Sequence, residues 1–85
     1  MTGGLVFPCD YPLKVVGRRD GDWRARVHAI VLRHVPQLEA ARISERDSAR
    51  GSFLSLSFNI PAHSREQIER LVAELKACEG VLFLL

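Results

Sequence analysis

The sequence predicts an α+β domain with the element order β-α-β-β-α-β, which is the ferredoxin-like plait. Three observations support this prediction. The chain has 85 residues, enough for one small domain. Residues 52–60 alternate apolar with polar side chains, as in a strand with one buried face, and stretches of helical periodicity lie on both sides of it. Such a plait has a four-stranded antiparallel sheet in the order 4-1-3-2, with two helices on one face.

The first strand follows a short N-terminal segment. Residues 1–9 are expected to form a flexible start, which frays before Leu5, and then an apolar docking segment. The strand is predicted over Tyr11–Val16, because Pro12 is tolerated only at the first positions of a strand. Its side chains alternate between the inward residues Leu13 and Val15 and the outward residues Lys14 and Val16.

A helix is predicted from Trp23 to about His34. Apolar residues recur there at helical spacing, namely Trp23, Val27, Ile30 and Val31. Asp20 or Asp22 is expected to cap its start. Pro36 ends it, because the residue before a proline is pushed out of the α region.

Two strands joined by a long hairpin come next. The second strand is predicted over Leu38–Ser44, and the charged loop Glu45–Gly51 connects it to the third. We expect this loop to be mobile, because it is polar and has few apolar contacts. The third strand, Ser52–Ile60, places four apolar residues on its buried face: Leu54, Leu56, Phe58 and Ile60.

A second helix and an apolar strand complete the order. Ser64 and Gln67 form a capping box at the helix start, and Gly80 supplies a left-handed C-cap. Glu66 and Arg70 form an i,i+4 pair on the solvent side. The buried stripe of this helix consists of Ile68, Leu71, Val72 and Leu75. The last strand is Val81–Leu85.

Composition limits the function. The formal charge of +2, from 12 Lys and Arg against 10 Asp and Glu, gives little attraction for nucleic acid or a membrane surface. No signal-like start and no run of about 18 apolar residues is present, so the sequence predicts a cytosolic protein. Cys9 and Cys78 are too few for a disulfide framework, and two reduced thiols are expected.

Several short motifs, taken in order, resemble the YbeD-like family of small uncharacterised bacterial proteins. They are Phe7-Pro8, Lys14-Val15-Val16-Gly17, Arg33-His34-Val35-Pro36, the run from Ser48 to Ser55, and Gln67-Ile68-Glu69-Arg70-Leu71 before the apolar C-terminus. Members of that family have the plait fold and look like ACT-type regulatory domains, with genes often near lipoate-attachment enzymes. The resemblance therefore implies a regulatory or partner-binding role, connected with lipoate metabolism, and implies no reaction.

The chain departs from the ACT pattern at one turn. Amino-acid-binding ACT domains usually carry an Asp-x-Pro-Gly type turn after their first strand. Here the corresponding stretch, Gly17–Asp22, contains no proline. This departure argues against an amino-acid ligand.

No residue pattern predicts a catalytic, cofactor or metal site. His28, His34 and His63 share no helix face at i,i+4 spacing. His34 is expected to meet the helix dipole rather than to act as a base, since no orienting carboxylate or nucleophile is evident. Cys9, and Cys78 on the last turn of the second helix, are expected to be inert.

Two activities known for plait folds match this sequence poorly. RNA-recognition plaits stack bases on a pair of aromatics, whereas the outer face here offers only Phe53 on the two central strands. Acyl-phosphate hydrolysis needs a glycine-rich phosphate cradle, which residues 17–21 imitate only loosely. A protein-binding module is therefore the first hypothesis, and a nucleic-acid-binding plait is the alternative.

The candidate interaction surface lies on the outer sheet face and the last strand. Its residues are Lys14, Phe53, Ser55, Ser57, Leu82 and Leu84. At the sheet edge, either Leu82 and Leu84 or else Val81, Phe83 and Leu85 should face water. This predicts a homodimer or another protein partner, bound at the edge strand or the outer face. The alternative is that Leu5, Val6 and Phe7 fold back over this surface.

The sequence thus predicts a non-enzymatic regulatory or adaptor module that binds another protein, with or without small-molecule sensing at a subunit or domain boundary.

Overall fold

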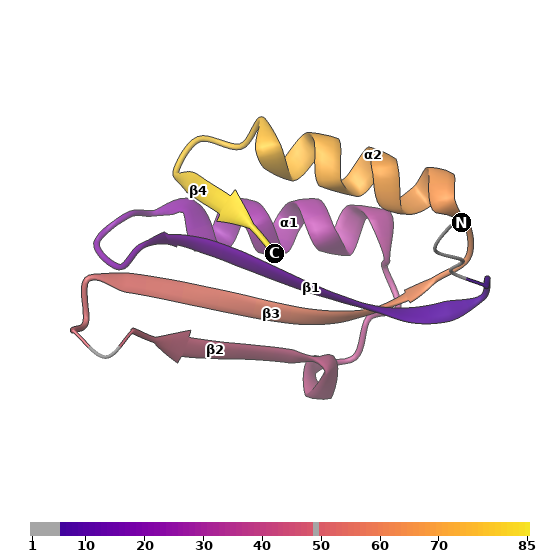
Figure 1. The fold of residues 1–85 in the computed structure, drawn as a ribbon, viewed down its shortest axis with the longest axis horizontal. Coiled ribbons are helices and arrows are strands. Elements are labelled where there is room, and N and C mark those ends of the chain that lie inside the picture. The colour runs from indigo at the N-terminus through magenta and orange to yellow at the C-terminus, as the bar shows by residue number, and fades with distance from the viewer. Residues whose placement is uncertain (1–5, 49) are drawn as a thin grey trace.

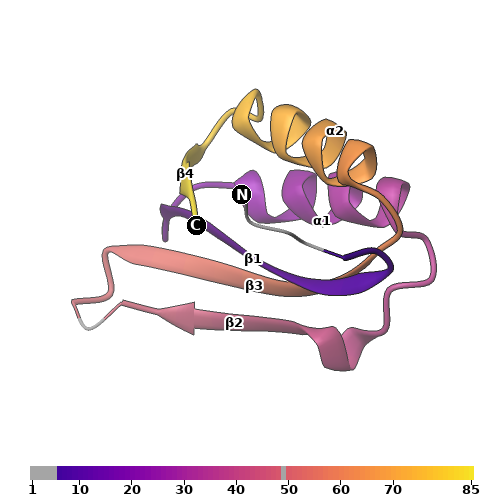
Figure 2. The ribbon, with the colours of Figure 1, turned by 45° about the vertical axis from the view of Figure 1, so that its right-hand side comes forward.

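The sheet has the predicted order. In the computed structural model, which describes residues 6–48 and 50–85, the strands β1 (Cys9–Arg18), β2 (Ile43–Asp47), β3 (Phe53–Ala62) and β4 (Val81–Leu84) form one antiparallel sheet ordered β2-β3-β1-β4. Helices α1 (Trp23–His34) and α2 (Arg65–Lys76) lie together on one side of it (Figures 1 and 2). This arrangement confirms the ferredoxin-like plait.

The long central pair, β1 and β3, carries most of the sheet's buried face. Their register runs from Cys9 opposite Ala62 to Arg18 opposite Phe53. The predicted inward residues of both strands are buried, namely Leu13, Val15, Leu54, Leu56, Phe58 and Ile60. Alternation in the sequence therefore identified the face that packs against the helices.

One tryptophan fills the space between the first helix and three glycines. Trp23, the first residue of α1, is fully buried, and its Nε1 donates a hydrogen bond of 2.8 Å to the carbonyl of Arg18. A Cβ atom at Gly17, Gly21 or Gly80 would fall 2.3, 2.8 or 2.6 Å from this side chain. The glycines therefore let the surrounding backbone approach the indole closely.

The two helix starts differ from each other. At α2 the predicted cap is confirmed, because the Ser64 hydroxyl accepts from the Gln67 N–H at 3.2 Å and the Gln67 side chain accepts from the His63 N–H at 2.6 Å. At α1 the expected side-chain cap is wrong. Asp22 makes no cap hydrogen bond there, since its carboxylate accepts instead from Arg26 at 2.9 Å.

The end of α2 also differs from the expectation. The helix ends at Lys76 with Ala77 as its C-cap, so Cys78 lies beyond the last turn. Gly80 has the predicted positive φ, 97°, but it belongs to the turn before β4 and does not cap the helix directly. The Glu66–Arg70 pair is present at 3.1 Å.

The second strand lies further along the chain than predicted. Leu38 is buried without strand structure, and Ala40–Arg42 form a short 3₁₀ turn (η1). The strand begins at Ile43, and Glu45–Asp47, which were predicted as loop, pair with β3. Charged residues are accommodated here because an edge strand leaves their side chains in contact with water and with two arginines, Arg24 of α1 and Arg19 in the turn after β1.

The N-terminal segment does not behave as one unit. Val6 is 78% exposed, whereas Phe7 packs partly buried against the core. Leu5 and the predicted fraying lie outside the described residues. Among the described residues, no helix is long and apolar enough to cross a membrane.

Candidate interaction surface

Three apolar side chains of the C-terminal strand face water. Leu82, Phe83 and Leu85 are 50%, 51% and 69% exposed, and we call them the apolar patch. Leu84 lies opposite Val15 on β1 and packs against the core. The patch therefore gives the sheet an uncovered apolar edge.

A β-bulge explains which residues form this patch. Strict alternation predicted either Leu82 with Leu84, or Val81 with Phe83 and Leu85. The register shifts between Phe83 and Val81, which leaves Leu82 as an extra residue on the strand. Neither predicted set of exposed residues is therefore correct. Leu84, which was predicted to belong to the interaction surface, packs against the core instead. Val6, at 78% exposure, does not cover the patch as the fold-back alternative required.

The side chains on the outer sheet face are apolar near β4, whereas serines lie on β3 and β2. The strand ladders align its side chains in rows across the four strands. One row, from β4 to β2, holds Phe83, Val16, Ser55 and Arg46. The next row holds Leu85, Lys14, Ser57 and Ser44. Phe53, 41% exposed, lies at the beginning of β3.

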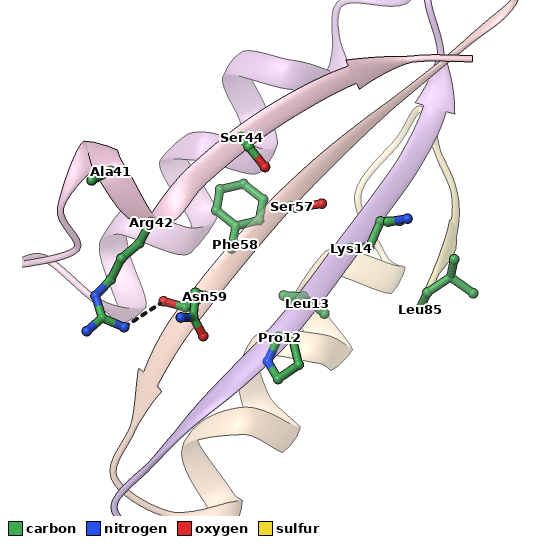
Figure 3. Close-up of a pocket in the computed structure, with 10 residues that line it drawn as sticks. All are labelled: Pro12, Leu13, Lys14, Ala41, Arg42, Ser44, Ser57, Phe58, Asn59 and Leu85. Carbon is green, nitrogen blue, oxygen red and sulfur yellow. Dashed lines mark hydrogen bonds between the residues drawn. The ribbon is translucent and has the colours of Figure 1, made fainter. Parts of the chain in front are cut away.

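A groove of about 560 Å³ crosses this face (Figure 3). Lys14 and Leu85 lie at one side of it, and Arg42 at the other, with Ser57 and Asn59 of β3 between them. Its size is within the range of ligand pockets, about 300–1,000 Å³. The structure thus brings together the predicted residues Lys14 and Ser57, while Ser55 and Phe53 lie outside this groove, beside a smaller depression.

The acidic side chains of β2 lie on the helix side of the sheet. Glu45 lies opposite the inward residue Leu56 and pairs with Arg24 of α1 at 2.7 Å. Asp47 pairs with Arg19 at 3.5 Å. Both carboxylates are therefore neutralised away from the outer face.

Basic side chains remain on the outer face. Arg46 lies opposite Ser55, one row from Lys14. Within residues 6–48 and 50–85, the ion pairs include neither Arg46 nor Lys14. Arg42, at the end of the groove, is paired with Asp10 at 3.1 Å. Among the described residues, the outer face thus carries two cations without a carboxylate partner, a feature that sequence reasoning missed because it placed Arg46 in a loop.

The histidines and cysteines are dispersed. His34 and Glu74 meet across the two helices with Nε2 and Oε1 2.7 Å apart, and Arg33 contacts the same carboxylate. This corrects the expectation that no carboxylate lies near His34. Cys9 and Cys78 are partly buried free thiols. In the part of the chain that the structure describes, no group of three metal-ligating side chains occurs.

In the described part of the chain, one pair of ionisable groups shows clear pKa shifts. The hydrogen bond and charge of Arg26 lower the pKa of Asp22, and the same hydrogen bond raises the pKa of Arg26. Both groups are at the surface, at the start of α1. The pair is a local contact of the helix and lies away from the groove.

The sequence matches one protein family over almost its whole length. The family model described as "Protein of unknown function (DUF493)" matches residues 4–85. A UPF0250 protein of Hahella chejuensis is 47% identical over 81 residues, which cover 95% of this chain and 89% of that protein. A UPF0250 protein of Shewanella sediminis is 40% identical over 77 residues, covering 91% and 85%.

Solved structures of low sequence identity share the fold. The C-terminal domain of the MgtC protein from Mycobacterium tuberculosis aligns with a TM-score of 0.65 at 20% identity, over 96% of this chain and 89% of that one. The ACT domain from GTP pyrophosphokinase of Chlorobium tepidum aligns with a TM-score of 0.60 at 12% identity, over 91% and 97%. At these identities the similarity shows the fold alone.

Proposed function

Because the chain belongs to the DUF493 family of small bacterial UPF0250 proteins, as its YbeD-like motifs implied, and has an ACT-like fold, we propose that it is a non-enzymatic regulatory module that works by binding other proteins. The fold neighbours include single domains of the MgtC protein and of GTP pyrophosphokinase.

The apolar patch is the observation that carries this proposal. Three large side chains at least half exposed, two on the edge strand β4 and one directly after it, are unusual for a surface that contacts only water. The opposite edge, β2, presents charged residues instead, which is how edge strands commonly avoid association. The β4 edge lacks that protection, so we assign it to a protein partner, with a second copy of this chain as the first candidate.

A non-enzymatic role is supported by the kind of residues the core contains. The described core has no buried polar or charged side chain, and the groups with shifted pKa values are exposed. Catalytic sites typically hold partly buried ionisable groups with perturbed pKa values. From the family resemblance we also propose a connection to lipoate-attachment enzymes.

Sedimentation equilibrium of the intact protein and of Leu82→Lys tests the proposal. Burying a half-exposed leucine contributes about 1 kcal/mol per subunit, so the substitution should weaken a dimer by about 2 kcal/mol, or roughly 30-fold. Leu32→Lys is the matched control, since Leu32 is 40% exposed on α1, away from the patch. A protein that stays monomeric at high concentration, or equal weakening by both substitutions, would reject the dimer.

A nucleic-acid-binding plait is the second candidate. The outer face carries Lys14 and Arg46 together with two exposed aromatic side chains, Phe53 and Phe83. The two rings lie on β3 and on the edge strand β4, with β1 between them, so they do not form the stacking pair of RNA-recognition plaits. Anisotropy titration with single-stranded RNA at low and high salt tests this candidate, because phosphate contacts weaken steeply as salt rises.

A further inference from the structure

The charged side chains on the two faces of the sheet differ in whether they have an ion-pair partner. On the helix side, Glu45 and Asp47 are each paired with an arginine. On the outer side, Lys14 and Arg46 project from β1 and β2 with no ion pair among the described residues. A surface with two free cations and no competing carboxylate between them is complementary to an acidic partner.

The spacing of the two cations can be worked out from the ladders. β3 lies between β1 and β2, so across the sheet the two residues are separated by two strand spacings of about 4.8 Å each. Along the strand direction they are offset by two residues, which is about 7 Å. Their Cα atoms are therefore about 12 Å apart on the diagonal. In an extended peptide, side chains four positions apart face the same way and are separated by about 13 Å.

The floor between the cations suits an extended backbone. Ser55 and Ser57 lie between Lys14 and Arg46 on the central strand and offer small hydroxyl side chains. Beyond Lys14, towards the edge, the surface becomes apolar at Phe83 and Leu85. A crossing segment would therefore meet an apolar region first, then a cation, two hydroxyls and a second cation.

From this juxtaposition we infer that the outer sheet face binds an acidic, extended segment of a partner protein. Two carboxylates four positions apart contact Lys14 and Arg46, and a leucine-like side chain two positions before the first carboxylate contacts Leu85, which lies beside Lys14 in the same row. The inference rests on the proposed function, since it names the chemistry of the protein partner. It uses the outer face, whereas the dimer uses the β4 edge, and Leu85 of the apolar patch belongs to both surfaces.

A labelled synthetic peptide provides the test. The probe has a leucine, a glutamate two positions later and a second glutamate four positions after that, with serines between them. Its binding to the full chain is followed by fluorescence anisotropy, and backbone amide shifts locate the contact. A peptide with both glutamates replaced by glutamine, and a six-nucleotide single-stranded RNA, serve as comparison ligands.

Charge-reversed variants locate the contacts. Lys14→Glu and Arg46→Glu should each weaken peptide binding by about three- to tenfold, because each reversal removes an exposed charge pair and adds a like-charge repulsion of similar size. Arg65→Glu makes the same change of charge at the first position of α2, on the helix side of the sheet, and should change binding less than twofold. Amide shifts should concentrate at Lys14, Arg46 and Ser57.

The possible results separate this inference from the proposed function. Saturable binding that is lost with the glutamine peptide and weakened by the two outer-face variants supports it. Absence of binding at millimolar peptide, equal effects of Arg65→Glu, or tighter binding of the RNA than of the peptide overturns it. If self-association through the apolar patch persists in that case, the proposed function stands without this partner. If the peptide binds but the chain is monomeric, the dimer fails and the acidic partner stands.

Discussion

Replacing Gly17 by alanine should test the packing around Trp23 more sharply than any change at the surface. A Cβ atom at this position would lie 2.3, 2.6 and 2.7 Å from Cε2, Nε1 and Cζ2 of the indole. Ordinary contacts of this kind are 3.4–4 Å long. The side chain or the strand must therefore move by about 1 Å, a distance that close-packed interiors resist.

The indole has little room to move. Trp23 is fully buried, Gly80 bounds it on another side, and its Nε1 hydrogen bond to Arg18 fixes its orientation. Overpacking of a core by one methyl group costs about 1–3 kcal/mol, and a constrained site belongs at the upper end of that range. For a domain of this size, about 3 kcal/mol lowers the unfolding midpoint by roughly 12–24 °C.

Urea unfolding followed by tryptophan fluorescence measures this loss directly, because Trp23 is the single tryptophan of the chain. Gly51→Ala is the control. Gly51 has a φ of 71°, so alanine there costs about 1 kcal/mol of backbone strain, but the nearest atom is the mobile end of Arg19 at 3.2 Å. An unfolding free energy for Gly17→Ala within 1 kcal/mol of the control would refute the packing argument.

Two further substitutions and one exchange measurement have defined outcomes. Ser64→Ala removes the cap of α2 and should lower the unfolding free energy by about 1 kcal/mol, while Ser44→Ala on the outer face should not; equal losses would contradict the capping role. Arg26 lowers the pKa of Asp22 below its ordinary 3.8. The stability from this pair is therefore present above pH 3.8 and is lost as the pH falls through the folded-state pKa. Asp22→Asn should remove this part of the acid unfolding profile, and an unchanged profile would count against the pair. The Ser48 amide donates a backbone hydrogen bond of 2.9 Å across the hairpin, so it should exchange more slowly than in an unstructured peptide. Free exchange would instead support the mobile loop that the sequence predicted.

The parts of the fold that sequence reasoning predicted well are those with a local signal. The alternation in β3 identified every inward residue of that strand from Leu54 to Ile60, because the pleat itself has a period of two. Ser64 identified the start of α2, since a capping hydroxyl acts within three residues. With these elements placed, handedness and connection rules led to the observed strand order.

The errors occurred where tertiary contacts override local preference. Glu45–Asp47 were predicted to form a loop because they are charged. In the structure, arginines on α1 and after β1 neutralise the two acids. That error moved Arg46 out of the sheet and concealed the second cation of the outer face. The bulge at Leu82 and the contact of His34 with Glu74, 40 residues apart, depend on register and helix packing, which no local pattern encodes.

One measurement would test the proposed protein-binding role of the β4 edge most directly. Backbone amide spectra of the intact chain, recorded over a series of dilutions, report which residues contact a second copy. We predict concentration-dependent shifts at Leu82, Phe83 and Leu85, with little change along β2. Spectra that do not change with concentration, or shifts confined to β2 or to the exposed faces of the helices, would contradict it.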